Sequence, residues 1–522
     1  MTGGASVGAC LAAARDPRMI LPGERIHVVG AGGAGASAAA LLGRAAGGDL
    51  SGCDAGGPSQ YTRALIEAGI PLAWEHSATH VTDPPVPDRL AVTKALTAIQ
   101  PDHPELVAAR RAGIPVEPWQ QVVADAAVGR TLIGVAGTHG KSTSAGWLVH
   151  LLVEAGADPS AFVGALMPPS LTGGAASTAR WGRGLPFVVE ADEYAGNFDA
   201  YRPSIAILTS AEWDHPDVFA DRAAVIAAFD AWLRRARPAA DGTPPVLVAN
   251  IADDGVAELV SGLAAWPGRV VATAVVDVPA QRLASFARGI AEQFATAGGP
   301  ARALLGRVAA LTSTMTDLEI HGLDPLRGAL TARLALVGRH NAANALGVAG
   351  AAAATGIAAD AIVTGLASFG GVGRRLERKG EAAGVVVYDD YGHHPTAIRL
   401  TLEAIRQREP GRRVWAVYEP LTYHRTAALL DDFATALAAA DGVAIADIWA
   451  GRDPDTTVAS AAGLAEAVAR RAPAIPVAAP GSVEATADWL ASQVRSGDAV
   501  LVMGGGRSYR IGELLLEAIE RR

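Results

Sequence analysis

The heptapeptide Gly137-Thr-His-Gly-Lys-Ser-Thr143 is the feature that most restricts what this chain can fold into. It follows the apolar residues 131–136, which are typical of a buried strand, and it precedes a helical pattern that runs to about Ala155. In a strand, glycine turn and helix, the glycines let backbone amides face a phosphate, and the helix N-terminus adds partial positive charge. Lys141 would reach the outer phosphates, and a hydroxyl of the loop would ligate magnesium. Val135 stands where the general pattern has glycine, so the loop is a variant. A chance strand-to-helix turn is the alternative interpretation.

Lysine usage makes Lys141 informative. Only Lys94, Lys141 and Lys379 are lysines among the 44 basic residues, so arginine occupies nearly every position that needs only a positive charge. The planar guanidinium of arginine does not replace a compact ammonium group folded into a phosphate-binding loop. We therefore expect Lys141 to have a specific role.

Length and composition restrict the class of protein. The 522 residues, half of them hydrophobic, suggest roughly three globular domains. A net charge of -9 argues against a nucleic-acid partner, and no apolar run approaches the ~18 residues that a membrane span requires. Only Cys10 and Cys53 are cysteines, which fits a reducing cytoplasm and excludes a disulfide framework. We expect a cytoplasmic protein that acts on a small substrate.

Alternating strand and helix patterns predict an α/β fold in three segments. Regular structure is expected from about Arg25, so residues 1–24 are predicted to form a disordered extension, with Met19 as an alternative start. Boundaries are expected near residues 128 and 371, the second in the glycine-rich stretch 369–373. The strand spacing of the last segment, like the strand and glycine turn of the first, suits a Rossmann-like sheet. Residues 265–330 mix strand and helix patterns and receive no detailed assignment.

Acidic side chains follow two strands of the middle segment. Glu190-Ala-Asp-Glu-Tyr194 ends one strand, and Asp214-His215 comes shortly after the next. Ligands of open parallel sheets gather at the carboxyl ends of strands, so both clusters are expected to face the phosphate loop and to hold one or two magnesium ions. Each cluster alone is more often a solvated strand end; the presence of both favours the metal interpretation.

Three further motifs carry less specific signals. The turn from Gly30 to Ser37 is either a generic tight turn or a helix N-terminus that holds a diphosphate, with Asp54 as a ribose or base partner. In Gly338-Arg-His-Asn-Ala-Ala-Asn344, Asn341 is either a helix cap or, with Asn344, a bracket for a base edge. The strand end Asp389-Asp-Tyr-Gly-His-His-Pro395 has more proton-active side chains than a routine loop.

In order and spacing, these motifs resemble those of the Mur ligase family of peptidoglycan synthesis, most closely the member that joins L-alanine to UDP-N-acetylmuramate. The similarity covers nearly the whole chain from Arg25 and includes residues 30–37, 103–110, 137–142, 190–194, 214–215, 338–341, 371–375, 389–395 and 423–426. It implies a Rossmann-like UDP-sugar-binding domain (25–128), a central P-loop-type ATPase α/β domain (129–371) and a Rossmann-like C-terminal domain (372–522). The third domain closes over the nucleotide and delivers the amino acid.

The resemblance also implies the chemistry and the site. ATP, with Mg²⁺ or Mn²⁺, phosphorylates the substrate carboxylate, and an amine attacks the acyl phosphate to form an amide. The implied catalytic residues are Lys141, Glu190, His215 and His393. Ser142, Glu190 and His215 are the implied metal ligands. ATP contacts are implied for Gly137, Thr138, His139, Gly140, Lys141, Ser142, Thr143, Asn341, Asn344, Arg374 and Asp389. The UDP-sugar is expected at Gly30, Gly32, Gly33, Gly35, Ser37 and Asp54, and the amino acid at Tyr391, His393 and Arg425.

Departures from the family pattern leave the amine substrate open. No lysine lies between positions 142 and 378, so the modified lysine that relatives use beside magnesium is absent. Pro420-Leu-Thr422 replaces the residues usual in alanine-adding members, whereas residues 190–203 and 211–219 are more similar to the murein-peptide ligase, which attaches a tripeptide to the same UDP-sugar.

A non-ligating ATP-binding relative is a third hypothesis. An NAD-dependent oxidoreductase would leave Lys141 without a role. The chain is expected as a monomer or homodimer.

Overall fold

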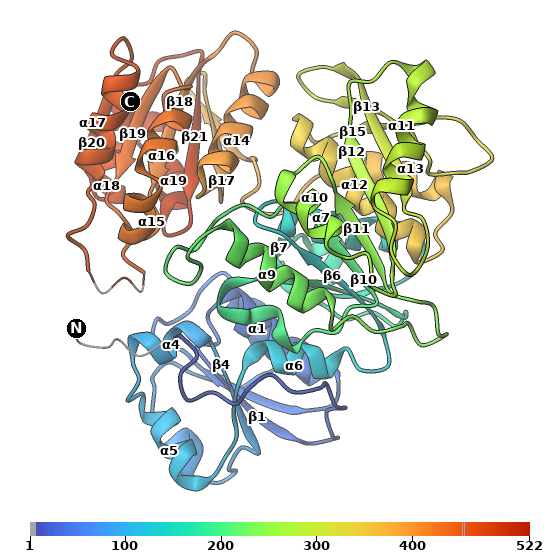
Figure 1. Cartoon of the computed structure of the whole chain (residues 1–522). Helices are drawn as coiled ribbons and strands as arrows, with labels where there is room; N and C mark the ends of the chain where they lie inside the picture. Colours follow the sequence, from blue (N-terminus) through green and yellow to red (C-terminus); the bar gives the residue numbers. More distant parts are fainter. Residues whose placement is uncertain (1–6, 452, 454, 522) are drawn as a thin grey trace.

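A computed structural model describes residues 7–451, 453 and 455–521. It contains three β-sheets of five, ten and six strands, which follow one another along the chain. Figure 1 shows the blue first sheet with its helices at the bottom of the molecule, and the central and C-terminal parts side by side above it. The predicted α/β fold with three sheets is confirmed.

The first sheet has the strand order β3-β2-β1-β4-β5, with every pairing parallel, which is the order of a Rossmann sheet. Its strands are β1 (Arg25–Val29), β2 (Asp49–Cys53), β3 (Leu72–Ala73), β4 (Arg89–Val92) and β5 (Val116–Pro118). Its helices are α1 (Ala34–Ala45), α2 (Thr62–Glu67), α3 (Thr79–Thr82), α4 (Lys94–Ile99), α5 (Pro104–Ala112) and α6 (Trp119–Ala126). Helix α5 ends on a glycine in the left-handed conformation, Gly113.

The central sheet has the order β15-β14-β13-β12-β11-β10-β6-β9-β7-β8. Its strands are β6 (Thr131–Ala136), β7 (Ser160–Met167), β8 (Ser177–Arg180), β9 (Pro186–Glu190), β10 (Ile205–Leu208), β11 (Val246–Asn250), β12 (Arg269–Val275), β13 (Arg302–Leu311), β14 (Thr316–His321) and β15 (Leu330–Leu334). Its helices are α7 (Lys141–Glu154), α8 (Pro169–Thr172), η1 (Tyr194–Ala200), α9 (Arg222–Leu233), α10 (Asp254–Ser261), α11 (Ala280–Gln293), α12 (Arg339–Ala354) and α13 (Ala359–Ser368). The unassigned residues 265–330 contain α11 and the strands that extend the sheet through antiparallel pairings.

The third sheet has the order β16-β17-β21-β18-β19-β20, and only the edge strand β16 is antiparallel to its neighbour. Its strands are β16 (Glu377–Ala382), β17 (Val385–Asp390), β18 (Arg413–Glu419), β19 (Gly442–Ala446), β20 (Val477–Gly481) and β21 (Asp498–Gly504). Its helices are α14 (Pro395–Arg408), α15 (Tyr423–Ala428), α16 (Leu430–Leu437), α17 (Ala461–Arg471), α18 (Val483–Gln493) and α19 (Ser508–Glu520). The inner strands are continuously buried, as parallel strands covered on both faces must be.

The N-terminal extension requires a correction over the part that the structure describes. Residues 1–6 lie outside the described residues, but residues 7–24 pack on the first domain rather than forming a disordered extension. The Arg15 guanidinium bonds to the Glu117 and Asp125 carboxylates, with Nε to Oε1 at 2.8 Å and Nη2 to Oδ2 at 2.7 Å. No local pattern revealed these partners, because they lie more than a hundred residues away in the sequence.

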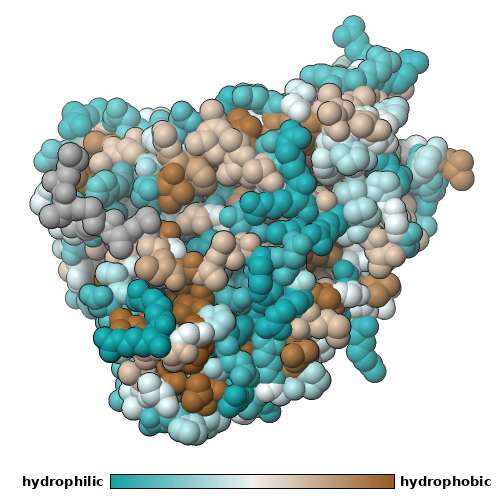
Figure 2. Space-filling view, turned by 60° about the horizontal axis from the view of Figure 1, so that its bottom comes forward, coloured by the Kyte–Doolittle hydropathy of each residue, from teal (hydrophilic) through white to brown (hydrophobic). Residues whose placement is uncertain are grey.

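The surface mixes polar and apolar residues. Figure 2 shows a face on which several separate hydrophobic groups lie between broad hydrophilic areas. No helix within the described residues combines the length and apolar character needed to cross a membrane.

Candidate active site

The phosphate loop connects β6 to α7 and depends on two glycines. Gly137 has φ 131° and Gly140 has φ 78°, both in the region that favours glycine. Space requires them as well: a Cβ atom at Gly137 would lie 2.2 Å from Thr209 Oγ1, and one at Gly140 would lie 2.6 Å from Asn344 Oδ1. The variant loop therefore packs tightly against the end of β10 and against α12.

Lys141 stands at the start of α7, is largely but not fully buried, and points back into the loop. Its Nζ lies 2.7 Å from Gly137 O, 2.9 Å from Glu193 Oε2 and 3.6 Å from Asp192 Oδ1. Burial alone lowers the pKa of Lys141, but the Glu193 and Asp192 carboxylates outweigh it and raise that pKa above its ordinary value. The ammonium group is charged and is held among carboxylates.

Glu190 ends β9 beside the loop. Its Oε1 accepts a hydrogen bond from Ser142 Oγ at 2.9 Å, and its Oε2 accepts one from Gly164 N at 2.6 Å. A Cβ atom at Gly164 would lie 2.9 Å from either carboxylate oxygen. Arg375, from the third domain, donates to Ser142 Oγ at 2.8 Å. Ser142 and Glu190, both predicted metal ligands, are therefore adjacent.

A second group of potential metal ligands consists of Asp192, Glu193 and His215, one donor atom of each lying within 4.8 Å of the others. Oxygen and imidazole donors of this kind fit Mg²⁺ or Mn²⁺. His215 contacts Arg425 of the third domain, whose Nη2 lies 2.9 Å from His215 Nδ1 and 2.8 Å from Asp214 Oδ1. Arg425 is 3% exposed, so α15 brings a buried cation onto the central domain.

The third domain also contributes Arg374 and the β17 end. Arg374 Nε donates to Asp389 Oδ2 at 3.0 Å, and its guanidinium carbon lies 5.1 Å from the Tyr391 ring centroid. Burial raises the pKa of Asp389 to about 6, although Arg374 opposes the shift. Burial and the Arg425 charge hold the pKa of His393 well below its usual range. His393 Nδ1 lies 2.9 Å from Tyr391 O.

Asn341 and Asn344 lie on the first turns of α12, facing the phosphate loop. Asn341 Nδ2 donates to Val337 O at 2.8 Å, and Asn344 Nδ2 donates to Asn341 Oδ1 at 3.2 Å. The capping interpretation of Asn341 is wrong, because Gly338 is the N-cap residue of α12 and the Asn341 amide donates to Val337 O instead of accepting from a helix N–H. Asn341 and Asn344 both line the cleft.

Glu212 joins two domains. Its Oε2 accepts from Thr396 Oγ1 at 2.6 Å and lies 3.5 Å from His139 Nε2 and 3.8 Å from His394 Nδ1. Burial opposes ionisation, but hydrogen bonds and the histidines lower the pKa of Glu212 to about 2. The carboxylate thus connects the phosphate loop to the start of α14.

The Gly30 turn lies at the first domain's edge. Gly32 N donates to Asp54 Oδ2 at 2.8 Å. A Cβ atom at Gly35 would lie 2.1 Å from the Trp119 ring, so helix packing requires this glycine. Ser37 is buried and donates to Ala34 O at 3.0 Å.

One cleft of about 1500 Å³ connects these groups across all three domains. Among the sequence-predicted residues it is lined by Gly35, Thr138, His139, Gly140, Lys141, Ser142, Thr143, Glu190, His215, Asn341, Asn344, Arg374, Asp389, Tyr391, His393 and Arg425. Gly137, Gly30, Gly32, Gly33, Ser37 and Asp54 are not among its lining residues. The predicted nucleotide and amino-acid residues are therefore brought together, whereas most of the predicted UDP-sugar residues lie beside the cleft.

Comparison with known proteins decides the family. Three family models match in succession: the Mur ligase family catalytic domain at residues 25–131, the Mur ligase middle domain at 135–352 and the glutamate ligase domain of Mur ligases at 374–506. The chain belongs to the Mur ligase family. It is thereby an enzyme of a family of ATP-dependent, ADP-forming amide ligases.

Relatives within the Mur ligase family match over nearly the full length. The UDP-N-acetylmuramate–L-alanine ligase of Frankia casuarinae is 36% identical, with 95% of this chain and 98% of the relative covered. The structure of UDP-N-acetylmuramate-alanine ligase from Thermotoga maritima superimposes with a TM-score of 0.71 at 22% identity, covering 94% of this chain and 98% of that one. A murein peptide ligase from Psychrobacter arcticus gives 0.67 at 24% identity, covering 96% and 99%.

Sequence reasoning missed several residues of the Mur ligase cleft. The Glu190–Tyr194 cluster was predicted as a whole to hold magnesium, but Asp192, which lines the cleft, and Glu193, which contacts Lys141, were not named individually. Arg375, which also lines the cleft, stands in the 371–375 motif and was not named either. Their position in the sequence, next to the predicted residues Glu190 and Arg374, was the signal that could have identified them. Glu212 had the same signal, since it stands two residues before Asp214 in the 211–219 motif, but its partners His394 and Thr396 come from another domain, so its contacts were not predicted.

Proposed function

We propose that this Mur ligase joins L-alanine to UDP-N-acetylmuramate, with ATP converting the sugar's carboxylate to an acyl phosphate that the amine then attacks. The observation that carries the proposal is the convergence of the phosphate loop, the carboxylate and histidine group, and Arg425 in one cleft. The full-length similarity to alanine-adding relatives supports this choice of substrates.

Each element of the cleft has a role in this reaction. The amides of the loop and the Lys141 ammonium would bind the outer phosphates of ATP and stabilise charge during phosphoryl transfer. Mg²⁺, held by Ser142 and Glu190 and by Asp192, Glu193 and His215, would neutralise phosphate charge when bound. Asn341 and Asn344 from the central domain, and Arg374 and Asp389 from the third, are proposed to contact the rest of the nucleotide.

The amine side is proposed to lie at Tyr391, His393 and Arg425. Since Tyr391 O is an acceptor, the His393 Nδ1 must donate to it, and the neutral ring then has an unprotonated Nε2. The low pKa of His393 keeps the ring neutral near pH 7. This nitrogen is proposed to receive the proton that the attacking amine loses. Arg425 would bind the carboxylate of the amino acid.

Attachment of a tripeptide to the same UDP-sugar is the second candidate. The similarity of residues 190–203 and 211–219 to murein-peptide ligases, and the structural match to one, favour it. Both candidates use the same proposed UDP-sugar site, at the Gly30 turn and Asp54. We place either reaction in the cytoplasm.

The experiment measures phosphate release from ATP with UDP-N-acetylmuramate plus either L-alanine or the tripeptide. Phosphate release that depends on L-alanine supports the proposal. Phosphate release that occurs only with the tripeptide favours the second candidate instead. If neither amine supports phosphate release, both candidates are contradicted. Lys141→Ala and Lys141→Arg should each reduce turnover by at least about 100-fold, because neither restores a compact ammonium group in the loop. Circular dichroism should show that both variants fold.

A further inference from the structure

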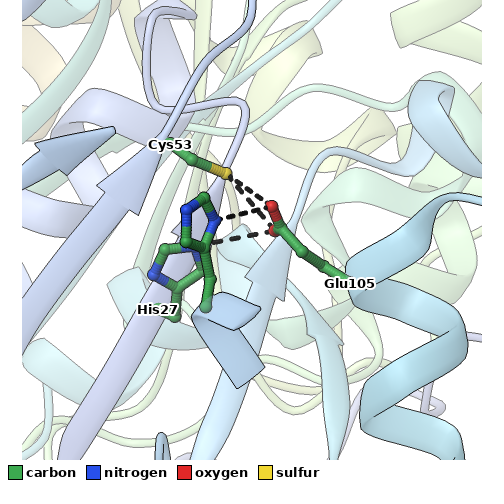
Figure 3. A group of neighbouring side chains, drawn as sticks. His27, Cys53 and Glu105 are labelled. Atoms are coloured by element: carbon green, nitrogen blue, oxygen red, sulfur yellow. Dashed lines mark hydrogen bonds and ion pairs between the residues drawn. The ribbon is translucent and has the colours of Figure 1, made fainter. Parts of the chain in front are cut away.

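A cluster of metal-ligating side chains lies in the first domain, away from the cleft. It consists of Cys53 at the end of β2, His27 on β1, His80 on α3 and Glu105 on α5. One donor atom of each lies within 4.8 Å of the others. None of the four lines the cleft between the domains. In Figure 3 the labelled Cys53 and His27 approach the Glu105 carboxylate from two neighbouring strands.

The distances between donor atoms are those of a compact coordination shell. Cys53 Sγ lies 3.1 Å from Glu105 Oε1, His80 Nδ1 lies 2.9 Å from the same oxygen, and His27 Nε2 lies 3.5 Å from Glu105 Oε2. Tetrahedral Zn²⁺, with bonds of about 2.0 to 2.3 Å, separates its ligand atoms by roughly 3.3 to 3.7 Å. Small side-chain adjustments would therefore accommodate the ion.

His27 supplies an independent observation that points to a ligand. Its side chain is 4% exposed, and its Nε2 is buried without a hydrogen-bond partner while directed at the cluster. The other ring nitrogen, Nδ1, lies 2.9 Å from Ser51 Oγ. A ring held through one nitrogen, with the second directed at other ligand atoms without a hydrogen bond, is the arrangement that metal-binding histidines adopt.

Charge balance supports the same conclusion. Glu105 is fully buried, and it contacts Cys53, His27, His76, His80 and the Ser77 amide, none of which carries a permanent positive charge. A buried carboxylate without a compensating charge is costly. A divalent cation between the carboxylate, the thiol and the imidazoles would remove that cost.

We propose that His27, Cys53, His80 and Glu105 form a structural zinc site that fastens β1, β2, α3 and α5 together. The sulfur, two nitrogens and one carboxylate oxygen would supply the four ligands of a closed tetrahedral site, with no position left for substrate. Asp54, which follows Cys53, accepts the hydrogen bond from Gly32 N, so the site also positions the Gly30 turn. This inference does not depend on the proposed reaction.

The test uses the full chain without a histidine tag, stripped with a chelator and reloaded with Zn²⁺ or Co²⁺ in excess Mg²⁺. The expected results are one equivalent of tightly held zinc and, with cobalt, a sulfur-to-metal charge-transfer band. That band requires Cys53 or Cys10, because these are the only cysteines in the chain and the cleft contains neither. It therefore separates this site from the histidines and carboxylates of the cleft.

Variants assign the ligands. Cys53→Ser should abolish the band, and His80→Ala, at a partly exposed position, should release the zinc while the fold persists. Cys10→Ser, at an exposed cysteine outside the cluster, should retain both. Absence of stoichiometric zinc from the parent protein, or a band that survives Cys53→Ser, would overturn the proposal. So would zinc retained by folded His80→Ala with unchanged affinity.

Discussion

Gly164 shows how one missing side chain positions Glu190, the carboxylate that we propose binds the metal. Gly164→Ala places a methyl group where the Glu190 carboxylate lies, 2.9 Å from its oxygens. Glu190 must then move from Gly164 N and Ser142, so the Mg²⁺ concentration for half-maximal activity should rise by about tenfold or more. Gly174→Ala is the control, because no atom lies within 4 Å of its added Cβ. Equal magnesium dependence in the two variants would contradict the assignment.

Asp389 makes a prediction about pH. Its folded-state pKa of about 6 exceeds the unfolded value near 3.9, so the folded protein binds this proton more tightly. Its contribution to stability is complete below about pH 4, declines as pH rises to 6, and amounts to roughly 3 kcal/mol at most. In Asp389→Asn this decline should disappear. Unfolding free energies of parent and variant, measured from pH 4 to 7, should diverge; parallel profiles would exclude the shift.

The residues of the cleft differ in how well the sequence predicts them. Lys141, Glu190 and His215 were predicted because the carboxyl ends of parallel strands meet at one edge of the sheet. A motif that directly follows such a strand is therefore expected at that edge, whatever else surrounds it. The Glu212 contacts were not predicted, because they form only when the third domain packs on the second. The grouping of His27, Cys53 and Glu105 was also hidden, since each lies on a different element.

Among the elements, β4 carries a buried cation that the fold requires. Arg89, 2% exposed, pairs with Glu24 at 2.9 Å and with Glu117 and Asp125 at 2.7 Å each. Arg89→Leu leaves these carboxylates without their buried partner and should destabilise the domain by about 3 to 5 kcal/mol. Arg25→Ala removes an exposed pair with Asp88 and should cost under about 1 kcal/mol. Denaturant unfolding compares them, and similar losses would show that burial does not decide the effect.

Element order was predicted better than sheet edges. The strands near 131–136, 186–190 and 385–388 are apolar runs with turn residues on both sides, so their burial follows from composition. Residues 265–330 resisted assignment because β13 and β14 are partly exposed and mix charged with apolar residues. Their pairing depends on neighbours in the sheet rather than on a local pattern.

For the whole molecule, Glu212 predicts how the third domain is held. Glu212→Ala removes the carboxylate between His139, His394 and Thr396, so the domain should separate more readily and the radius of gyration without nucleotide should increase. Glu258→Ala, which breaks an exposed pair with Arg222 inside the central domain, should leave it unchanged. Small-angle X-ray scattering measures both.

Acid provides a second readout of the same contact. The pKa of Glu212 is lowered to about 2, so its stabilising charge is present above the unfolded value near 4.3 and is lost as pH falls toward 2. The difference in domain separation between parent and Glu212→Ala should therefore persist down to about pH 4 and shrink below it. A difference that vanishes already near pH 6 would point to the histidines instead.

The close approach of Gly140 and Asn344 also restricts which substitutions this protein can accept during evolution. Any side chain at position 140 would occupy the space of the Asn344 amide, 2.6 Å away, although the two residues are separated by 204 positions in the printed sequence. A mutation at either position therefore alters what is acceptable at the other. Descendants of this protein should keep both residues or exchange them together, and an inherited change at only one should be rare.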